Sequence, residues 1–267
     1  MRTVDRALGL LKYFTVDSPE WGLSDLARAA RMDKATTLRM LQVMTRHGFL
    51  AQDAATRRFR LGIAPLNLAR VREATNPLTS VIEPVMDAIM TATNETTHAS
   101  TGIGTTVVPI GVSEPQRSTR VFVDPSLELP IHAAASGLAY LAFGEPSVLE
   151  AVLADPDFEE FTDDTPLSRA DVMPHIEEAR RHGFSVADKT YDDEVVGVAA
   201  PFFDQSGYAQ GTIAVATPTY RMSEDKLRET AQAVVDGALE ITRGIGAEPS
   251  QDYLKAIGRT QTAGAVA

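Results

Sequence analysis

The chain has 267 residues, 44% of them hydrophobic, and a formal net charge of −11, which suits two folded domains. It contains no cysteine, which excludes disulfides and thiolate metal sites. No stretch reads as a membrane span or a signal peptide, so the sequence predicts a cytoplasmic protein that does not contact a membrane.

The charge is distributed unevenly along the chain. Residues 1–72 contain 13 Lys and Arg against 6 Asp and Glu, whereas residues 73–267 contain 12 against 30. Phosphate would repel a uniformly acidic protein, but a basic N-terminal part provides the positive surface that DNA binding requires. The distribution favours contact with DNA through the N-terminal part alone.

The first predicted element is an amphipathic helix over residues 3–14. Its apolar residues on or near one face are Val4, Ala7, Leu8, Leu10 and Leu11. The segment is too short and too charged to cross a bilayer, so we expect it to pack on the N-terminal domain.

Two short helices follow within residues 23–46. Ser24 can cap the first through its hydroxyl, and this helix is expected to end near Ala30. Arg31 and Met32 form a short turn, after which Asp33 is a good cap for the second helix. A helix, a tight turn and a second helix in this order predict a helix-turn-helix.

The second helix has an apolar and a polar side. The periodicity predicts that the buried side consists of Leu38, Leu41, Val43 and Met44. The exposed side then carries Lys34, Thr36, Thr37 and Arg39. Short hydroxyl side chains allow close approach to DNA, and long cationic ones reach phosphates or guanine edges. This side of the helix is therefore the predicted reader of the major groove.

A charged hairpin completes the domain. Phe49 and Leu50 begin one strand, residues 53–56 make a tight connection, and the second strand is expected to carry Arg57, Arg58 and Arg60. The alternative is an ordinary core with solvated arginines. We favour a winged helix-turn-helix whose DNA-binding residues are Ser24, Lys34, Thr36, Thr37, Arg39, Arg57 and Arg58.

The pattern predicts four regions. Residues 1–62 form the winged domain, and residues 63–77 a linker helix with Leu66 and Ala69 inside, broken at 75–77. Residues 78–247 form a second domain, and residues 248–267 a tail that is mobile from Thr260 onward.

Helices and strands alternate in the second domain. Helices are expected over residues 79–93, 136–143, 147–154, 168–182 and 223–245. Strands are expected over residues 96–103, 107–112, 121–123, 185–187, 195–203 and 211–216. These elements predict an α+β domain of about 170 residues, large enough to enclose a small-molecule cavity.

Seven segments between Val4 and Gly246 carry a family resemblance through their order and spacing. They are VDRALGLLKYF, LSDLARAARMDKATTLRML, FRLG, NETTHAS, LPIHAAASGLAYLAFG, RRHGFSVADK and AAPFFDQSGYAQGTIAVATP. In this the chain resembles IclR-type transcriptional regulators. The resemblance implies a GAF-like C-terminal domain that binds a small organic effector, and a homodimer or dimer of dimers on double-stranded, palindromic operator DNA. A linker helix would couple the two functions.

The resemblance also implies an effector pocket and shows where this chain differs. Members that bind small carboxylates place serine at the positions of Ala214 and Ala216, an acidic residue at Ala187 and cysteine at Gly197. Losing these polar groups makes the wall a poor host for an oxo-acid. The pocket positions carried over are Val121, Leu129, Ala135, Ser136, Ala187, Val195, Gly197, Ala214 and Ala216.

We therefore expect a larger or more apolar effector, with an aromatic acid or related aromatic compound as the first choice. Ser136 and the amides that begin its helix would hold the polar end of this effector. His98 faces either the cavity or a neighbour outside it, and His132 fits a structural hydrogen bond better. Tyr191 either closes over the ligand or is simply exposed.

Family habit favours a repressor of a catabolic operon; the alternative is an activator that responds to a small oxo-acid. An enzyme with an attached DNA-binding domain is the competing class. However, the sequence lacks the common catalytic motifs, and the nearest candidate pair is Ser136 with His132. An architectural DNA binder would leave the second domain without a role. The acidic stretch 155–164 fits a solvated connection better than a metal site, so we expect neither metal nor cofactor.

Overall fold

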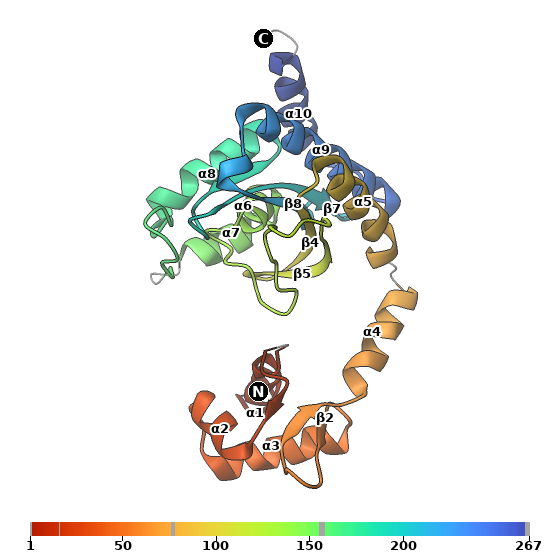
Figure 1. Cartoon of the computed structure of the whole chain (residues 1–267), viewed down its shortest axis with the longest axis vertical. Helices are drawn as coiled ribbons and strands as arrows, with labels where there is room; N and C mark the ends of the chain where they lie inside the picture. Colours follow the sequence, from red (N-terminus) through yellow and green to blue (C-terminus); the bar gives the residue numbers. More distant parts are fainter. Residues whose placement is uncertain (1, 16, 76–77, 155–157, 265–267) are drawn as a thin grey trace. The chain divides into compact units, whose positions relative to one another are not determined.

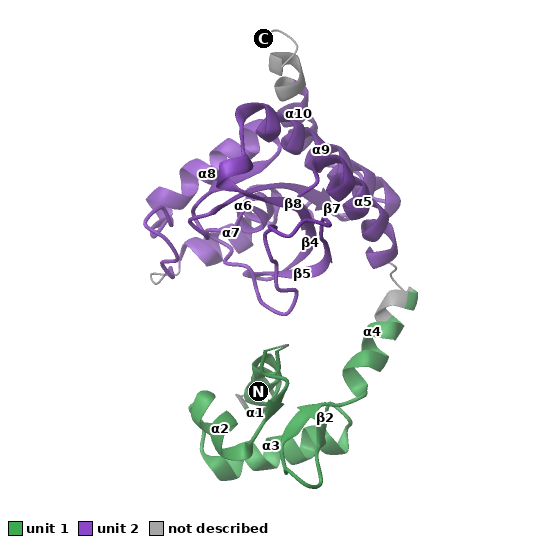
Figure 2. Ribbon diagram, in the orientation of Figure 1, with its two compact units in different colours: residues 1–77 green, residues 78–267 purple. Residues whose placement is uncertain are grey.

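The computed structural model describes residues 2–15, 17–75, 78–154 and 158–264. The chain divides into two compact units, Met1–Pro77 and Leu78–Ala267, which we call the winged unit and the sheet unit (Figure 1, Figure 2). No helix among the described residues is long and apolar enough to cross a membrane.

The winged unit has the predicted order of elements, with one additional strand. It comprises α1 (Arg2–Gly9), the 3-10 turn η1 (Leu10–Tyr13), β1 (Glu20–Trp21), α2 (Leu23–Ala29), α3 (Lys34–Arg46), β2 (Leu50–Gln52), β3 (Phe59–Leu61) and α4 (Ala64–Thr75). The strands form an antiparallel sheet in the order β1-β3-β2. The predicted helix over residues 3–14 is thus two elements, and the short strand β1 was not predicted.

The core of the winged unit follows helical periodicity with one correction. Its most deeply buried side chains are Leu10, Leu26, Leu41, Leu50 and Phe59. On α3, Met40 and Met44 are buried, whereas Val43, predicted to be buried, is 45% exposed. Leu38 is half-buried against the same core.

The linker helix α4 is apolar and exposed. Leu66, predicted to lie inside, is 47% exposed, and Ala69 is also exposed. The prediction of a buried face is wrong because nothing within the described part of the winged unit covers these side chains. Of the predicted break at residues 75–77, Thr75 is the last residue of α4, and residues 76–77 lie outside the described residues.

The sheet unit is built on a five-stranded antiparallel sheet in the order β5-β4-β8-β7-β6. The strands are β4 (Thr96–Ile103), β5 (Thr106–Ser113), β6 (Ser185–Asp188), β7 (Val195–Phe203) and β8 (Ala209–Pro218). The helices are α5 (Leu78–Thr93), α6 (Ala135–Phe143), α7 (Pro146–Leu153), α8 (Arg169–His182), α9 (Glu224–Gly244) and α10 (Gln251–Gly264), with a 3-10 turn η2 (Thr219–Arg221).

Two elements differ from the sequence prediction. Residues 121–123 form no strand and lie instead in the long loop after β5. Residues 251–264, predicted to be a tail mobile from Thr260, form α10, on which Tyr253 and Ala256 are buried. Residues 265–267 lie outside the described part of the chain.

Alternation along β7 and β8 gives the sheet two apolar faces. Val198, Phe202 and Val215 belong to the core that contains α5 and α9, whereas Ala199 and Ala214 belong to the core that contains α6, α7 and α8. Because strand residues alternate between faces, the small residues gather on the α6 side. That face therefore has room beside α6.

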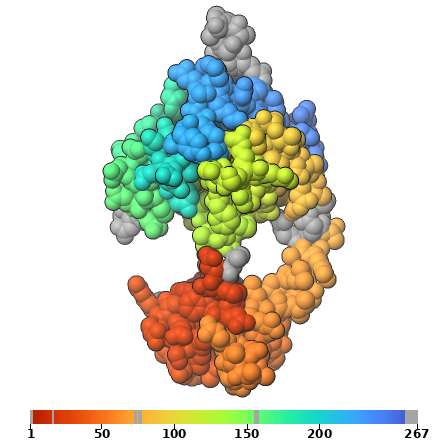
Figure 3. All heavy atoms as spheres, in the orientation of Figure 1, coloured from red at the N-terminus to blue at the C-terminus, as the bar shows by residue number. Residues whose placement is uncertain are grey.

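A buried ion pair holds the loop after β5, which lies at the surface of the sheet unit in yellow-green (Figure 3). The Glu95 carboxylate is 2% exposed and accepts hydrogen bonds of 2.7 Å from both Nε and Nη2 of Arg221. Arg117 lies 3.6 Å from the same carboxylate. Thr96 Oγ1 donates to the Val121 carbonyl at 2.7 Å, so the loop is fixed against β4.

Candidate functional site

The start of α3 is fixed by a side-chain cap. Asp33 accepts a hydrogen bond from the Thr36 amide at 2.8 Å, as predicted. Hydrogen bonds from Thr36 hold the pKa of Asp33 below its usual value. The cap sets which side chains of the first turn are exposed.

The predicted reader residues of α3 do not all lie on its exposed side. Lys34 and Arg39 are exposed and Thr36 is half-buried. Thr37 is 0% exposed, and its hydroxyl donates to the Asp33 carbonyl at 2.9 Å. Its predicted exposure is wrong, because it lies on the core side with Leu41.

Ser24 also has a different position from the one predicted. The helix α2 begins at Leu23, and its N-cap is Gly22 without a side-chain hydrogen bond. Ser24 is therefore an exposed residue inside the first turn and not its cap. The short strand β1, which was not predicted, ends at Trp21, and α2 begins soon after it at Leu23, before the predicted cap Ser24.

The wing presents its two predicted arginines before β3 rather than on it. Arg57 and Arg58 are exposed, and Asp53 orders the turn by accepting from the Ala55 and Thr56 amides. Arg58 Nη2 donates to the Glu20 carbonyl at 2.8 Å and so ties the wing to β1. The sequence analysis did not single out the exposed residues Gln42 and Arg46, which follow Arg39 at helical spacing.

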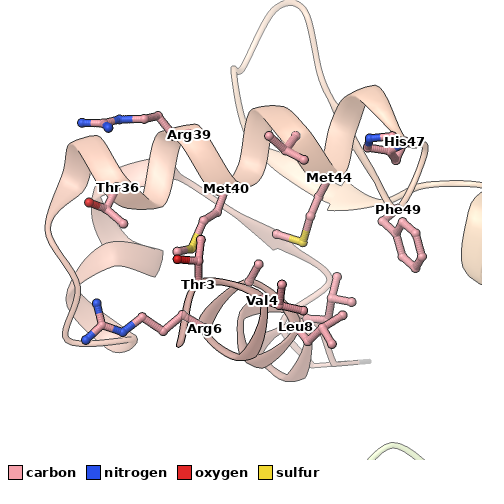
Figure 4. Close-up of a pocket in the computed structure, with 13 residues that line it drawn as sticks. Thr3, Val4, Arg6, Leu8, Thr36, Arg39, Met40, Met44, His47 and Phe49 are labelled. Atoms are coloured by element: carbon pink, nitrogen blue, oxygen red, sulfur yellow. The ribbon is translucent and has the colours of Figure 1, made fainter. Parts of the chain in front are cut away.

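A groove of about 550 Å³ separates α1 from α3. Met40 and Met44 point toward α1, where Val4 and Leu8 face them (Figure 4), and Arg6 and Arg39 also line the groove. Val4 and Leu8 are 65% and 56% exposed. The winged unit thus has an exposed apolar groove that is also lined by two arginines.

The sheet unit contains a cavity of about 310 Å³ beside the start of α6, which we call the α6 cavity. All ten residues predicted to contact an effector line it. They are His98, Val121, Leu129, Ala135, Ser136, Ala187, Val195, Gly197, Ala214 and Ala216. Further lining residues include Phe122, Asp124, Leu127 and Asp192, which lie in loops that gave no periodic signal.

Strand register builds the floor of the cavity. Ala187 pairs with Gly197 and Gly197 with Ala216, so three small residues lie side by side across β6, β7 and β8. His98 pairs with Ala214 on the neighbouring strands β4 and β8. A Cβ atom at Gly197 would lie 3.1 Å from the Ala135 Cβ, so any side chain there would narrow the cavity.

The polar end of the cavity lies where α6 begins. The N-cap Ala134 provides no side-chain hydrogen bond, which leaves the amides of the first turn without a side-chain cap. His98 Nε2 lies 3.2 Å from Ser136 Oγ. Burial lowers the pKa of His98 to about 4, so its imidazole is neutral at physiological pH.

The Ser136–His98 pair is not a catalytic set within the described residues. A serine nucleophile requires a base that a third group orients, but His98 Nδ1 is buried without a hydrogen-bond partner in the described part of the chain. His132, the base considered from sequence, stacks on Phe158, and its Nε2 lies 3.0 Å from the Glu159 carbonyl oxygen. The geometry is suited to holding a ligand.

The cavity volume restricts the ligand. A void of about 150 Å³ is sufficient for benzene, so about 310 Å³ holds one substituted ring. Tyr191 lines the cavity while its side chain is partly exposed and packs edge-on against Phe161.

A basic winged helix-turn-helix joined to an α+β domain with a small-molecule cavity defines a ligand-responsive DNA-binding regulator. Models of the IclR helix-turn-helix domain and of the bacterial transcriptional regulator IclR C-terminal domain match residues 3–54 and 74–243. The chain belongs to the IclR family of transcriptional regulators.

Similar proteins of known name are regulators and not enzymes. The chain is 27% identical over 245 residues to the HTH-type transcriptional regulator BhcR of Paracoccus denitrificans, covering 92% of this chain and 88% of the relative. It is 25% identical over 248 residues to the HTH-type transcriptional repressor AllR of Escherichia coli K12, covering 92% and 90%.

Solved structures share the whole fold. A putative IclR regulator from Silicibacter sp. TM1040 is 36% identical with a TM-score of 0.86, covering 94% of this chain and 98% of that one. An IclR homologue from Microbacterium hydrocarbonoxydans, solved in complex with 4-hydroxybenzoate, is 23% identical with a TM-score of 0.76, covering 92% and 100%.

Proposed function

We propose that this regulator is a cytoplasmic repressor of a catabolic operon, released from its operator by a compact aromatic compound bound in the α6 cavity. The observation that carries the proposal is that the predicted effector positions all line one cavity with small apolar walls and a polar end. Such a cavity excludes water from a ring and orients a single polar group.

The winged unit supports DNA binding through α3 and the wing. Lys34, Thr36 and Arg39 lie at the start of α3, the part of a recognition helix that contacts base edges. Arg57 and Arg58 are placed to contact the sugar-phosphate backbone. Ser24, in the first turn of α2, is a further candidate phosphate contact, whereas the buried Thr37 has a structural role.

Two observations on relatives support the repressor and the aromatic ligand. AllR of Escherichia coli is named a repressor, and the Microbacterium hydrocarbonoxydans homologue binds 4-hydroxybenzoate. A single substituted ring also agrees with the volume of the α6 cavity. We therefore propose a ligand of that size.

Exposed apolar side chains support a homodimer, or a dimer of dimers. Leu66, Leu68 and Val71 of α4 are 47%, 57% and 61% exposed, and Val4 and Leu8 of α1 are comparably exposed. Apolar side chains gathered on one domain mark an association surface. A dimer also reads two operator half-sites, as one recognition helix covers only a few base pairs.

Release from DNA requires the ligand to bind two arrangements of the protein with different affinity. We propose that α4, which joins the two units, carries this coupling. Its exposed apolar side chains would pack differently in the DNA-bound and the released dimer.

The test starts by selecting operator DNA with the full chain from a pool of random duplexes. Release of the selected duplex is then followed by fluorescence anisotropy during titration with 4-hydroxybenzoate and 4-hydroxybenzamide. We expect release by at least one of them, and no release for Ser136→Leu, which fills the cavity but leaves DNA binding intact. Tighter DNA binding on ligand addition would instead support an activator, and release only in a parallel titration with pyruvate would support an oxo-acid sensor.

A further inference from the structure

The charged groups around the α6 cavity are carboxylates. Asp124 and Asp192 both line it, and none of its lining residues, all of which are described, is a lysine or an arginine. The arginines of the adjoining loop are paired with acidic residues: Arg117 with Glu95 and Arg120 with Glu114. A bound anion would therefore meet two negative charges and no cation.

Both carboxylates are held in fixed turns by hydrogen bonds from neighbouring residues. Asp124 accepts from the amide and the hydroxyl of Ser126 at 2.8 and 2.7 Å, and these bonds lower its pKa. Asp192 is exposed and accepts from the Glu194 amide at 2.9 Å. Exposed carboxylates carry a negative charge at neutral pH.

The buried polar pair of the cavity is uncharged. His98 is neutral at physiological pH, and Ser136 has no charge at any pH. Between them they offer donors and acceptors, and His98 Nδ1 has no partner within the described residues. Such a pair matches a head group that both donates and accepts hydrogen bonds.

The start of α6, at Ala135 and Ser136, is a positive feature among the described lining of the cavity. A helix N-terminus is equivalent to about half a positive charge, which is less than the two full negative charges of Asp124 and Asp192. The N-terminus of α6 can still attract the partial negative charge of a carbonyl oxygen. Burying an ionised carboxylate without a cation costs far more than burying a neutral amide that is hydrogen-bonded.

We propose that the effector is uncharged: an aromatic compound whose head is a neutral amide or a similar group that donates and accepts, and not a carboxylate. The inference rests on the proposed function, because it assigns the ligand class of the same cavity. The head lies against Ser136, His98 and the start of α6, and the ring lies on Ala214, Ala216 and Val121.

The test compares ligands of nearly equal shape and different charge. Calorimetry on the full chain at low salt measures the dissociation constants of 4-hydroxybenzamide and 4-hydroxybenzoate, and of benzamide and benzoate. We expect the amide to bind at least about tenfold more tightly in each pair. Tighter binding of the acids would overturn the uncharged effector and leave the proposed aromatic sensor intact. If neither the amides nor the acids bind, both the uncharged effector and the proposed aromatic sensor are overturned.

Variants test the electrostatic cause directly. Asp124→Asn and Asp192→Asn keep the turn hydrogen bonds and remove one charge each. Each is expected to raise benzoate affinity about threefold or more at low salt, with little change for benzamide. Asp204→Asn is the matched control, because Asp204 accepts from Ser206 in the same kind of turn and does not line the cavity. Equal effects of all three variants, or none from the first two, would contradict the proposal.

Discussion

The winged unit and the sheet unit use charge in opposite ways. The first 72 residues carry more than twice as many basic as acidic residues, and Lys34, Arg39 and Arg57 are exposed. The remaining residues carry a large acidic excess, and the α6 cavity is lined mainly by small apolar side chains. One chain thus combines a basic unit suited to a polyanion with a cavity whose charged lining groups are carboxylates.

The largest expected effect is a loss of stability in the sheet unit alone. Arg221→Met removes the bidentate partner of the buried Glu95 carboxylate, which should cost about 3 kcal/mol or more of unfolding free energy. Differential scanning calorimetry would show a lower melting temperature for the sheet unit and an unchanged one for the winged unit. Arg228→Met, which breaks only exposed ion pairs with Glu224 and Asp225, is the control and should cost less than about 1 kcal/mol.

Acid should also weaken the sheet unit. The pKa of His98 is lowered from 6.5 to about 4, so the unfolded chain takes up a proton that the folded chain does not. This difference in proton uptake has no effect on the free energy of unfolding above pH 6.5. It lowers that free energy as the pH falls toward 4, by about 3 kcal/mol in total.

The test measures stability against pH for His98→Gln and for the exposed control His47→Gln. His98→Gln should reduce the decrease in the free energy of unfolding between these pH values. Part of the decrease should remain, because burial also lowers the pKa of His175. A pH profile unchanged by His98→Gln would show that this imidazole is not held neutral.

A substitution of the exposed Arg39 tests DNA binding by the winged unit. Arg39→Ala should weaken operator binding by about 1–3 kcal/mol, or roughly 10- to 100-fold, because it removes a base or phosphate contact. Ligand binding, measured by calorimetry, should stay unchanged. Arg228→Ala in the sheet unit is the control for loss of a charge. Equal loss of DNA and ligand binding would mean that Arg39 has a structural role.

The smallest expected effect is a change in the ligand preference of the α6 cavity. Ala214→Ser with Ala216→Ser adds two hydroxyls at positions where the family resemblance implies serine in members that bind small carboxylates. Each new hydrogen bond contributes about 1 kcal/mol, so pyruvate affinity should rise about tenfold or more while DNA binding stays constant. Calorimetry with pyruvate measures it, and an unchanged affinity would remove these two positions from the ligand contacts.

Caps and periodicity predicted the helix-turn-helix and most strands. Asp33 before α3 was predicted as a cap from its residue type and accepts the expected amide hydrogen bond, whereas Ser168, predicted as the first residue of a helix, is the cap of α8. Thr37 was misplaced, although its spacing of four from Leu41 is a helical core spacing. Its hydroxyl bonds back to the helix, so a polar residue could be buried there without cost.

Other features depend on tertiary contacts that one sequence does not reveal. Residues 121–123 read as a strand, but Thr96 holds the Val121 carbonyl and no strand pairs with them. The apolar pattern of α4 predicted burial, yet Leu66 is exposed in the single chain. The ten cavity residues came from a family resemblance, and Asp124 and Asp192 were missed because loop residues have no period.

The most direct test of the account is a thermal-shift screen of the full chain and of Ser136→Leu. The panel contains aromatic amides, aromatic acids and small oxo-acids, because a ligand that binds only the folded state raises the melting temperature with its concentration. We expect the melting temperature to rise with aromatic compounds, most with the amides, and Ser136→Leu to abolish this rise. A shift only with small oxo-acids, or one that persists in Ser136→Leu, would contradict an aromatic effector in the α6 cavity.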